Sequence, residues 1–70
     1  SSSYRCHQKT RVTIPPNTTA TVYVSAKDAA SVTENGKAID KAESVKFMRM
    51  ENGCAVYEVG SGQYSFGSKL

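Results

Sequence analysis

Cys6 and His7 are the side chains of this sequence best suited to nucleophilic chemistry. Such catalysis needs a nucleophile, a histidine base within hydrogen-bonding reach and an orienting carboxylate. The two residues are adjacent in a segment with weak strand character, and neighbouring strand residues point to opposite faces. We therefore expect no nucleophilic catalytic site. The single histidine also excludes a multi-histidine metal site within this chain.

Paired carboxylates, as used in glycoside hydrolysis, are the second candidate for catalysis. The acidic residues are Asp28, Glu34, Asp40, Glu43, Glu51 and Glu58. Four of them lie in expected turns or connectors, and Glu58 would face Lys46 in a hairpin predicted over residues 45–59, so we interpret them as solvated charges. The glycines of Gly60-Ser61-Gly62 predict a turn, because no phosphate-binding helix follows them. We expect no cofactor.

Tyrosines offer a third chemistry, since their rings stack against sugars when they share a solvent-facing surface. The chain has four, at positions 4, 23, 57 and 64. Tyr23, Tyr57 and Tyr64 are the candidate sugar contacts. The alternative is that these rings pack in the core or at a sheet edge and keep only the hydroxyl in water.

Composition bounds the partners. Seventy residues make one domain, in which a hydrophobic core alone gives little stability. The net charge is +3, but acidic residues interleave with the basic ones, whereas nucleic-acid binding favours clustered cations. No apolar run approaches the roughly 20 residues of a membrane span, and no signal peptide is visible. We expect neither nucleic acid nor membrane as a partner.

The two cysteines, Cys6 and Cys54, are far apart in the sequence. Their even number allows a disulfide, and the loop that it closed would be long enough to stabilise the fold. Two cysteines do not make a disulfide framework, however. We therefore favour free or half-buried thiols.

Residues 12–24, VTIPPNTTATVYV, are the centre of the predicted fold. Apolar residues alternate along 9–14 and 19–24, which predicts two half-buried strands. Pro15 and Pro16 remove two backbone donors between them, so the strands need not be neighbours in one sheet. Residues 25–31 predict a loop or a crossing between sheets.

Two hairpins follow in the sequence. Asn35-Gly36 predicts the first, over 32–39, with Glu34 facing Lys37. The second covers 45–59, and a three-residue loop with Gly53 as a bulge would pair Phe47 with Tyr57 and Met50 with Cys54. A weak strand over 1–6 could fold back on 9–14 through residues 7–8. Residues 63–66 form a last strand, and 67–70 a frayed end.

These elements predict an all-β fold, a small antiparallel β-sandwich of six to seven short strands, or a small barrel. Glycines at 36, 53 and 62 and the two prolines would form its turns. The expected core residues are Val12, Ile14, Val22, Val24, Val32, Phe47, Tyr57, Val59, Tyr64 and Phe66.

Three ordered segments carry a resemblance to a known family: VTIPPNTTATVYV at 12–24, SVTENGKAI at 31–39 and YEVGSGQYSF at 57–66. Together they resemble the C-terminal β-sandwich domain of bacterial α-L-rhamnosidases. That domain usually begins with a longer strand and a hairpin containing a tryptophan. Here only eleven residues precede Val12, with Tyr4 in the corresponding place. Either the hairpin is short in this member, or the first strand is missing.

The resemblance implies that residues 1–70 are a single accessory domain, the C-terminal part of a glycoside hydrolase that releases terminal α-L-rhamnose by inversion. The catalytic carboxylates would lie in a helical barrel outside this chain, so no catalytic residue is carried over. The implied partners are that catalytic domain and rhamnose-containing glycans, and a periplasmic or secreted parent is favoured. A stand-alone carbohydrate-binding module using exposed tyrosines is the alternative.

Overall fold

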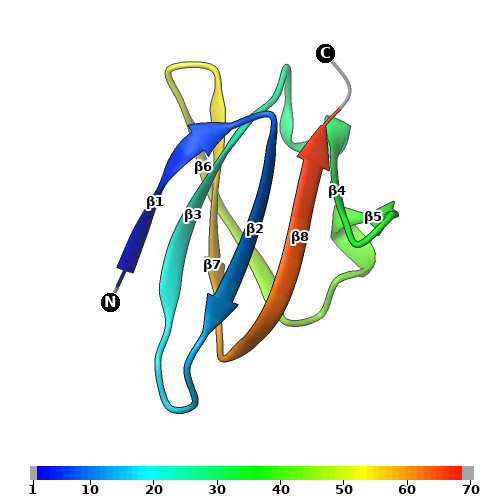
Figure 1. The fold of residues 1–70 in the computed structure, drawn as a ribbon. Helices are drawn as coiled ribbons and strands as arrows, with labels where there is room; N and C mark the ends of the chain where they lie inside the picture. Colours follow the sequence, from blue (N-terminus) through cyan, green and yellow to red (C-terminus); the bar gives the residue numbers. More distant parts are fainter. Residues whose placement is uncertain (1, 69–70) are drawn as a thin grey trace.

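A computed structural model describes the backbone of residues 2–68 and the side chains of residues 5–68. The fold is a sandwich of two four-stranded sheets, with strands far apart in the sequence lying side by side (Figure 1). Two short 3-10 helices lie in the connections. In chain order the elements are β1 (Ser2–His7), β2 (Lys9–Ile14), β3 (Ala20–Ser25), η1 (Ala29–Ser31), β4 (Val32–Glu34), β5 (Lys37–Ala38), η2 (Ile39–Lys41), β6 (Val45–Glu51), β7 (Cys54–Val59) and β8 (Gly62–Ser68).

The two sheets have the strand orders β1-β3-β7-β6, here called sheet A, and β2-β8-β4-β5, here called sheet B. All pairs are antiparallel except β1 with β3, which is parallel. The predicted all-β sandwich is confirmed. It has eight described strands rather than six to seven. No helix in the described part of the chain is long and apolar enough to cross a membrane.

The connection from β2 to β3 crosses from sheet B to sheet A, an arrangement that the two prolines had left open. Asn17 takes a positive φ of 62°, a backbone conformation that asparagine tolerates better than most residues. The Thr18 hydroxyl donates to the Pro16 carbonyl oxygen at 3.5 Å. Residues 26–31 make a second crossing, from β3 to β4, and this was expected.

The prediction that residues 1–6 fold back on 9–14 is wrong. The strand β1 instead lies alongside β3, while β2 pairs with β8, so the chain changes sheets between His7 and Lys9. A two-residue hairpin loop requires positive φ values. Neither His7 nor Gln8 adopts one, which leaves the sheet-to-sheet crossing as the connection.

The first predicted hairpin is confirmed around Asn35-Gly36, whose φ values are 52° and 82°. Glu34 faces Lys37, and Thr33 faces Ala38. Val32 does not pair with Ile39, because η2 begins there. The hairpin is therefore shorter than the sequence alone indicated.

In the second hairpin, the residue pairs farthest from the turn are the predicted ones, but the turn itself differs. Phe47 faces Tyr57 as expected, but Met50 faces Ala55 rather than Cys54. The loop is the two residues Asn52 and Gly53, both with positive φ. The extra residue lies instead in a bulge between Phe47 and Arg49. Because the bulge takes up one extra residue of β6, the favoured two-residue Asn-Gly turn and the Phe47–Tyr57 pair can form in the same hairpin.

The core lies between the sheets and contains every expected residue except Phe47, which is 46% exposed. Phe47 is on β6, the edge of sheet A, where no residue is fully buried. The last strand also differs, since Gly67 and Ser68 belong to β8 rather than to a frayed end. Positions 69–70 and the Tyr4 side chain lie outside the described part. The core cluster consists of Val12, Ile14, Ala20, Val22, Val24, Ala26, Val32, Ile39, Ala55, Tyr57, Val59, Tyr64 and Phe66.

Candidate functional site

The three candidate sugar-contact tyrosines do not lie on one surface. Tyr57 and Tyr64 point between the sheets, where their side chains are 1% and 8% exposed. Tyr23 is half-buried on the outer face of sheet A, where it faces Val56. A ring must present a face to solvent before a sugar can stack on it. Of the three, only Tyr23 has that opportunity in this structure.

Tyr57 anchors the interior of the sandwich to the crossing between β3 and β4. Its hydroxyl donates a hydrogen bond to the Ala29 carbonyl oxygen at 3.1 Å. Burial, with a smaller contribution from the Asp28 carboxylate, raises the pKa of Tyr57 from 10.0 to about 12. Asp28 caps η1, since its Oδ1 accepts from the Ser31 backbone N–H at 3.0 Å. The phenol is therefore a neutral donor that fixes η1.

A row of four aromatic rings runs from the core to the surface. The Tyr64 and Phe66 rings are stacked with centroids 6.0 Å apart, and Phe66 and Tyr57 are stacked at 6.2 Å. Tyr57 then meets Phe47 edge to face at 5.6 Å. Phe47 is the exposed end of this row. The sandwich core therefore reaches solvent at β6.

Beside Phe47 an apolar groove of about 560 Å³ opens between the edges of the two sheets. Tyr57 and the buried Ile39 line it, together with the half-buried Val45. Asp40 is an exposed charged residue within its lining. The groove is lined by Ala29, Ala30, Ala38, Ile39, Asp40, Val45, Phe47 and Tyr57.

Sequence reasoning missed this groove because Phe47 was expected in the core. Alternation along residues 45–59 correctly placed Phe47 on the same face as Tyr57. Periodicity gives the side of a strand but not the extent of the opposite sheet. The mixed charges along β6, at Lys46, Arg49 and Glu51, were the available signal of an edge strand.

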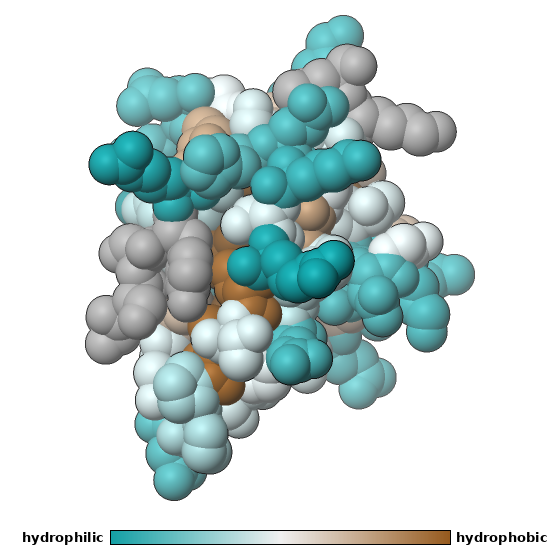
Figure 2. Space-filling view, viewed as in Figure 1, coloured by the Kyte–Doolittle hydropathy of each residue, from teal (hydrophilic) through white to brown (hydrophobic). Residues whose placement is uncertain are grey.

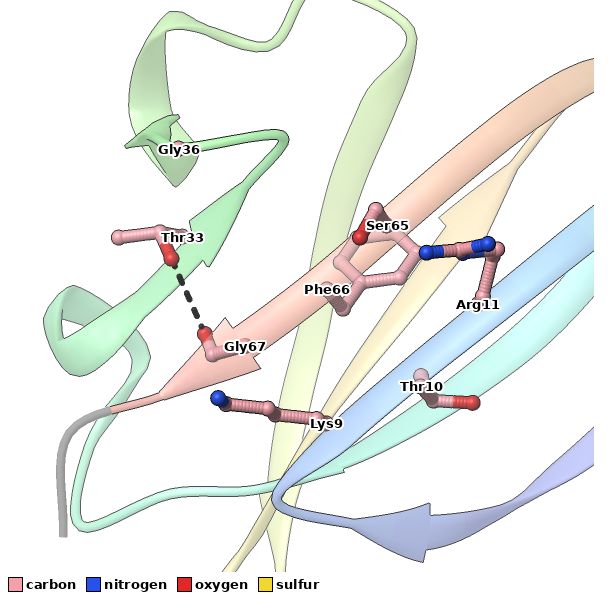
Figure 3. Close-up of a pocket in the computed structure, with 8 residues that line it drawn as sticks. All are labelled: Lys9, Thr10, Arg11, Thr33, Gly36, Ser65, Phe66 and Gly67. Atoms are coloured by element: carbon pink, nitrogen blue, oxygen red, sulfur yellow. Dashed lines mark hydrogen bonds between the residues drawn. The ribbon is translucent and has the colours of Figure 1, made fainter.

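The outer face of sheet B carries a polar hollow (Figure 3). Lys9 and Arg11 border it on β2, and Ser65 and Gly67 lie next to them on β8. Thr33 donates from its hydroxyl to the Gly67 carbonyl oxygen at 3.3 Å. The face seen in Figure 2 is mostly hydrophilic, with one narrow apolar strip. The Lys9, Arg11 and Ser65 side chains that border the hollow can donate hydrogen bonds to hydroxyl groups or anions. The alternation along residues 9–14 had predicted that Lys9 and Arg11 face outward.

Cys6 and Cys54 form a disulfide, and their Cα atoms are 6.1 Å apart. The expectation of free thiols is therefore wrong. The bond joins β1 to β7 beside the end of β3, where Ser25 faces Cys54. Strand alternation in the sequence could not show that β3, which lies between β1 and β7, ends beside the two cysteines. Both thiols are consumed, so neither serves as a nucleophile beside His7.

The acidic residues are distributed over the fold. Glu51 pairs with Arg49 at 3.2 Å on the surface, and Glu58 faces Lys46 across β6 and β7 in the predicted register. Asp28 is engaged in its cap. Within the described residues, no group of three or more histidine, cysteine or acidic side chains is placed to hold a metal ion.

Comparisons with known proteins give one informative similarity. The chain is 42% identical over 53 residues to an α-L-rhamnosidase of Streptomyces avermitilis. The match covers 76% of this chain and 4% of the Streptomyces protein. No family model matches the chain, and no solved structure does. The similarity fits a domain of a larger α-L-rhamnosidase.

Proposed function

We propose that this chain is a non-catalytic, C-terminal accessory domain of an α-L-rhamnosidase that braces the enzyme's catalytic domain. The observation that carries the proposal is the 42% identity to a small part of the Streptomyces α-L-rhamnosidase. A two-sheet sandwich with a stiff core suits a bracing role, because it presents fixed surfaces to a neighbouring domain. In this proposal, release of α-L-rhamnose is carried out by the remainder of the polypeptide.

The disulfide supports an exported parent. Disulfides persist in oxidising compartments such as the periplasm and the extracellular space, and they are rare in the cytosol. The Cys6–Cys54 bond therefore favours a periplasmic or secreted α-L-rhamnosidase.

The test compares the full-length polypeptide with a version truncated before Ser1. Hydrolysis of p-nitrophenyl α-L-rhamnoside and the thermal midpoint are measured for both. For a brace, truncation lowers the midpoint, and activity falls only with the folded fraction. An unchanged midpoint would contradict the bracing role. A full-length protein that does not hydrolyse the rhamnoside would contradict the assignment to this enzyme.

A second candidate, a carbohydrate-binding module, is favoured by the polar hollow on sheet B. Lys9, Arg11 and Ser65 offer several hydrogen-bond donors on one open face. Tyr23 is a half-buried aromatic residue on the other sheet. For such a module, truncation raises KM for a rhamnose-containing glycan while the midpoint stays unchanged. Lys9→Ala and Arg11→Ala would then raise KM in the full-length protein, whereas Lys46→Ala on sheet A would not.

A further inference from the structure

The largest exposed apolar side chains of the described residues gather on one strand. Phe47, Met48 and Met50 are 46%, 44% and 38% exposed, and all three belong to β6. Single exposed apolar residues are common on protein surfaces, but a group of them beside a groove indicates an interaction site. The groove described above adjoins Phe47.

The geometry of the two sheet edges explains why this groove is open. β6 ends sheet A and β5 ends sheet B, so the sandwich has two edges on this side. β5 has only two residues, and η2 follows it directly. Such a short edge covers little of the inward face of β6. Among the described residues, Phe47 and Val45 are therefore only partly covered by apolar neighbours.

The walls of the groove are anchored to the core of the sandwich. Tyr57 is 1% exposed, and its hydroxyl bond to Ala29 ties the lining to η1. Ile39 is 9% exposed and belongs to the core cluster. Phe47 rests edge to face on Tyr57. A preformed apolar site of this kind loses little conformational entropy when it binds a partner.

We propose that this groove docks the catalytic part of the same polypeptide, which inserts a bulky apolar side chain between Phe47 and Ile39. The inference rests on the proposed function and names the surface through which the brace acts. The length of the related enzyme suggests this occupant. The match covers only 4% of the Streptomyces protein, so in a parent of similar length most of the polypeptide lies outside this domain and can pack against it.

Asp40 defines a further feature of the occupant. It is an exposed acid in an otherwise apolar or aromatic lining. An arginine or lysine next to the apolar anchor would complement it, and partial burial of such a pair strengthens its interaction. The expected partner surface therefore presents an apolar side chain flanked by a basic one.

The test introduces a charge into the groove of the full-length polypeptide. Phe47→Glu places a carboxylate at the wall, and Gln63→Glu is the control, because Gln63 is exposed on β8, outside both the groove lining and the apolar group of β6. We expect Phe47→Glu to lower the thermal midpoint, or to split unfolding into two transitions. It should also speed proteolytic release of this domain by about tenfold or more, as the loss of a buried aromatic anchor implies. Gln63→Glu should match the wild type.

A second variant guards against a folding defect of Phe47→Glu. Ala30 lines the groove but is exposed on η1, so Ala30→Glu adds charge without disturbing the core. It should release the domain as Phe47→Glu does. Lys37→Ala, on exposed β5 outside the lining, is its control. If Phe47→Glu and Ala30→Glu both behave as their controls, the docking proposal is overturned.

Other occupants give different results. A second copy would produce concentration-dependent dimers in sedimentation that Phe47→Glu abolishes, and this would overturn the proposal. A sugar occupant would produce a midpoint rise with L-rhamnose that Phe47→Glu abolishes, which would also overturn it. If truncation before Ser1 destabilises the parent but neither groove variant does, the bracing role survives and this surface is wrong. If truncation has no effect, the bracing role itself fails.

Discussion

The Cys6–Cys54 disulfide should decide whether the isolated 70-residue chain stays folded. The change to test is its removal, by reduction or by the double substitution Cys6→Ala with Cys54→Ala. The bond joins two strands of sheet A that do not pair directly, because β3 lies between them. It therefore holds the first strand to the middle of the fold independently of the β1–β3 hydrogen bonds.

The magnitude follows from the loop that the bond closes. The cysteines are 48 positions apart, and in the chain-entropy model such a crosslink stabilises the fold by about 4 kcal/mol. A domain of this size has a total stability of roughly 4–10 kcal/mol. Since each kcal/mol corresponds to about 4–8 °C in a small domain, reduction should lower the midpoint by roughly 15–30 °C.

The assay is thermal unfolding followed by far-ultraviolet circular dichroism, with and without a reductant. The oxidised chain should unfold cooperatively, and the reduced chain should be largely unfolded near 37 °C. The double alanine variant is the control, since reductant should not affect it. A shift below about 5 °C on reduction would refute the reasoning, as would two free thiols in the chain purified without a reductant.

Two further outcomes are expected. Tyr57→Phe removes the hydrogen bond to Ala29 and should cost about 1 kcal/mol in urea unfolding. The fold raises the pKa of Tyr57 from 10.0 to about 12, so the contribution of the neutral phenol to the free energy of unfolding is complete below pH 10 and is lost as pH rises towards 12. Urea denaturation curves should show this loss for the wild type and not for Tyr57→Phe. Gly36→Ala should cost about 1 kcal/mol, because φ is +82° and no atom crowds the added Cβ, so the cost comes from the backbone alone. Gly60→Ala, with equal space and no positive φ, should be close to neutral by the same measurement, and equal costs for both would contradict this explanation.

Local signals in the sequence predicted most of the strands correctly. The Asn35-Gly36 turn and the Pro15-Pro16 interruption act over a few residues, so their outcome does not depend on the remaining fold. The alternation around Val22 and Val24 likewise needs only one buried face. These features placed nearly all of the core before the structure was known.

Features set by distant segments were not predictable in this way. Cys6 could be matched to Cys54 only after β1 was placed beside β3, and no local pattern encodes that parallel pair. Phe47 has the alternation of a core residue, yet its exposure depends on the short length of β5 in the other sheet. Val56 is the opposite of Phe47. Its alternation with buried Tyr57 places it on the outer face of sheet A and predicts exposure to water, yet it is only 1% exposed.

The order of synthesis matters for sheet B, because its edge strand β2 pairs only with β8. Lys9 faces Gly67 and Ile14 faces Gly62, so the partner of β2 is synthesised after all the other described strands. Such non-local pairing makes folding slow. Until β8 arrives, β2 exposes an unpaired edge together with Val12 and Ile14 to other nascent chains. The cations at Lys9 and Arg11 lie on the same strand and should limit aggregation during that interval.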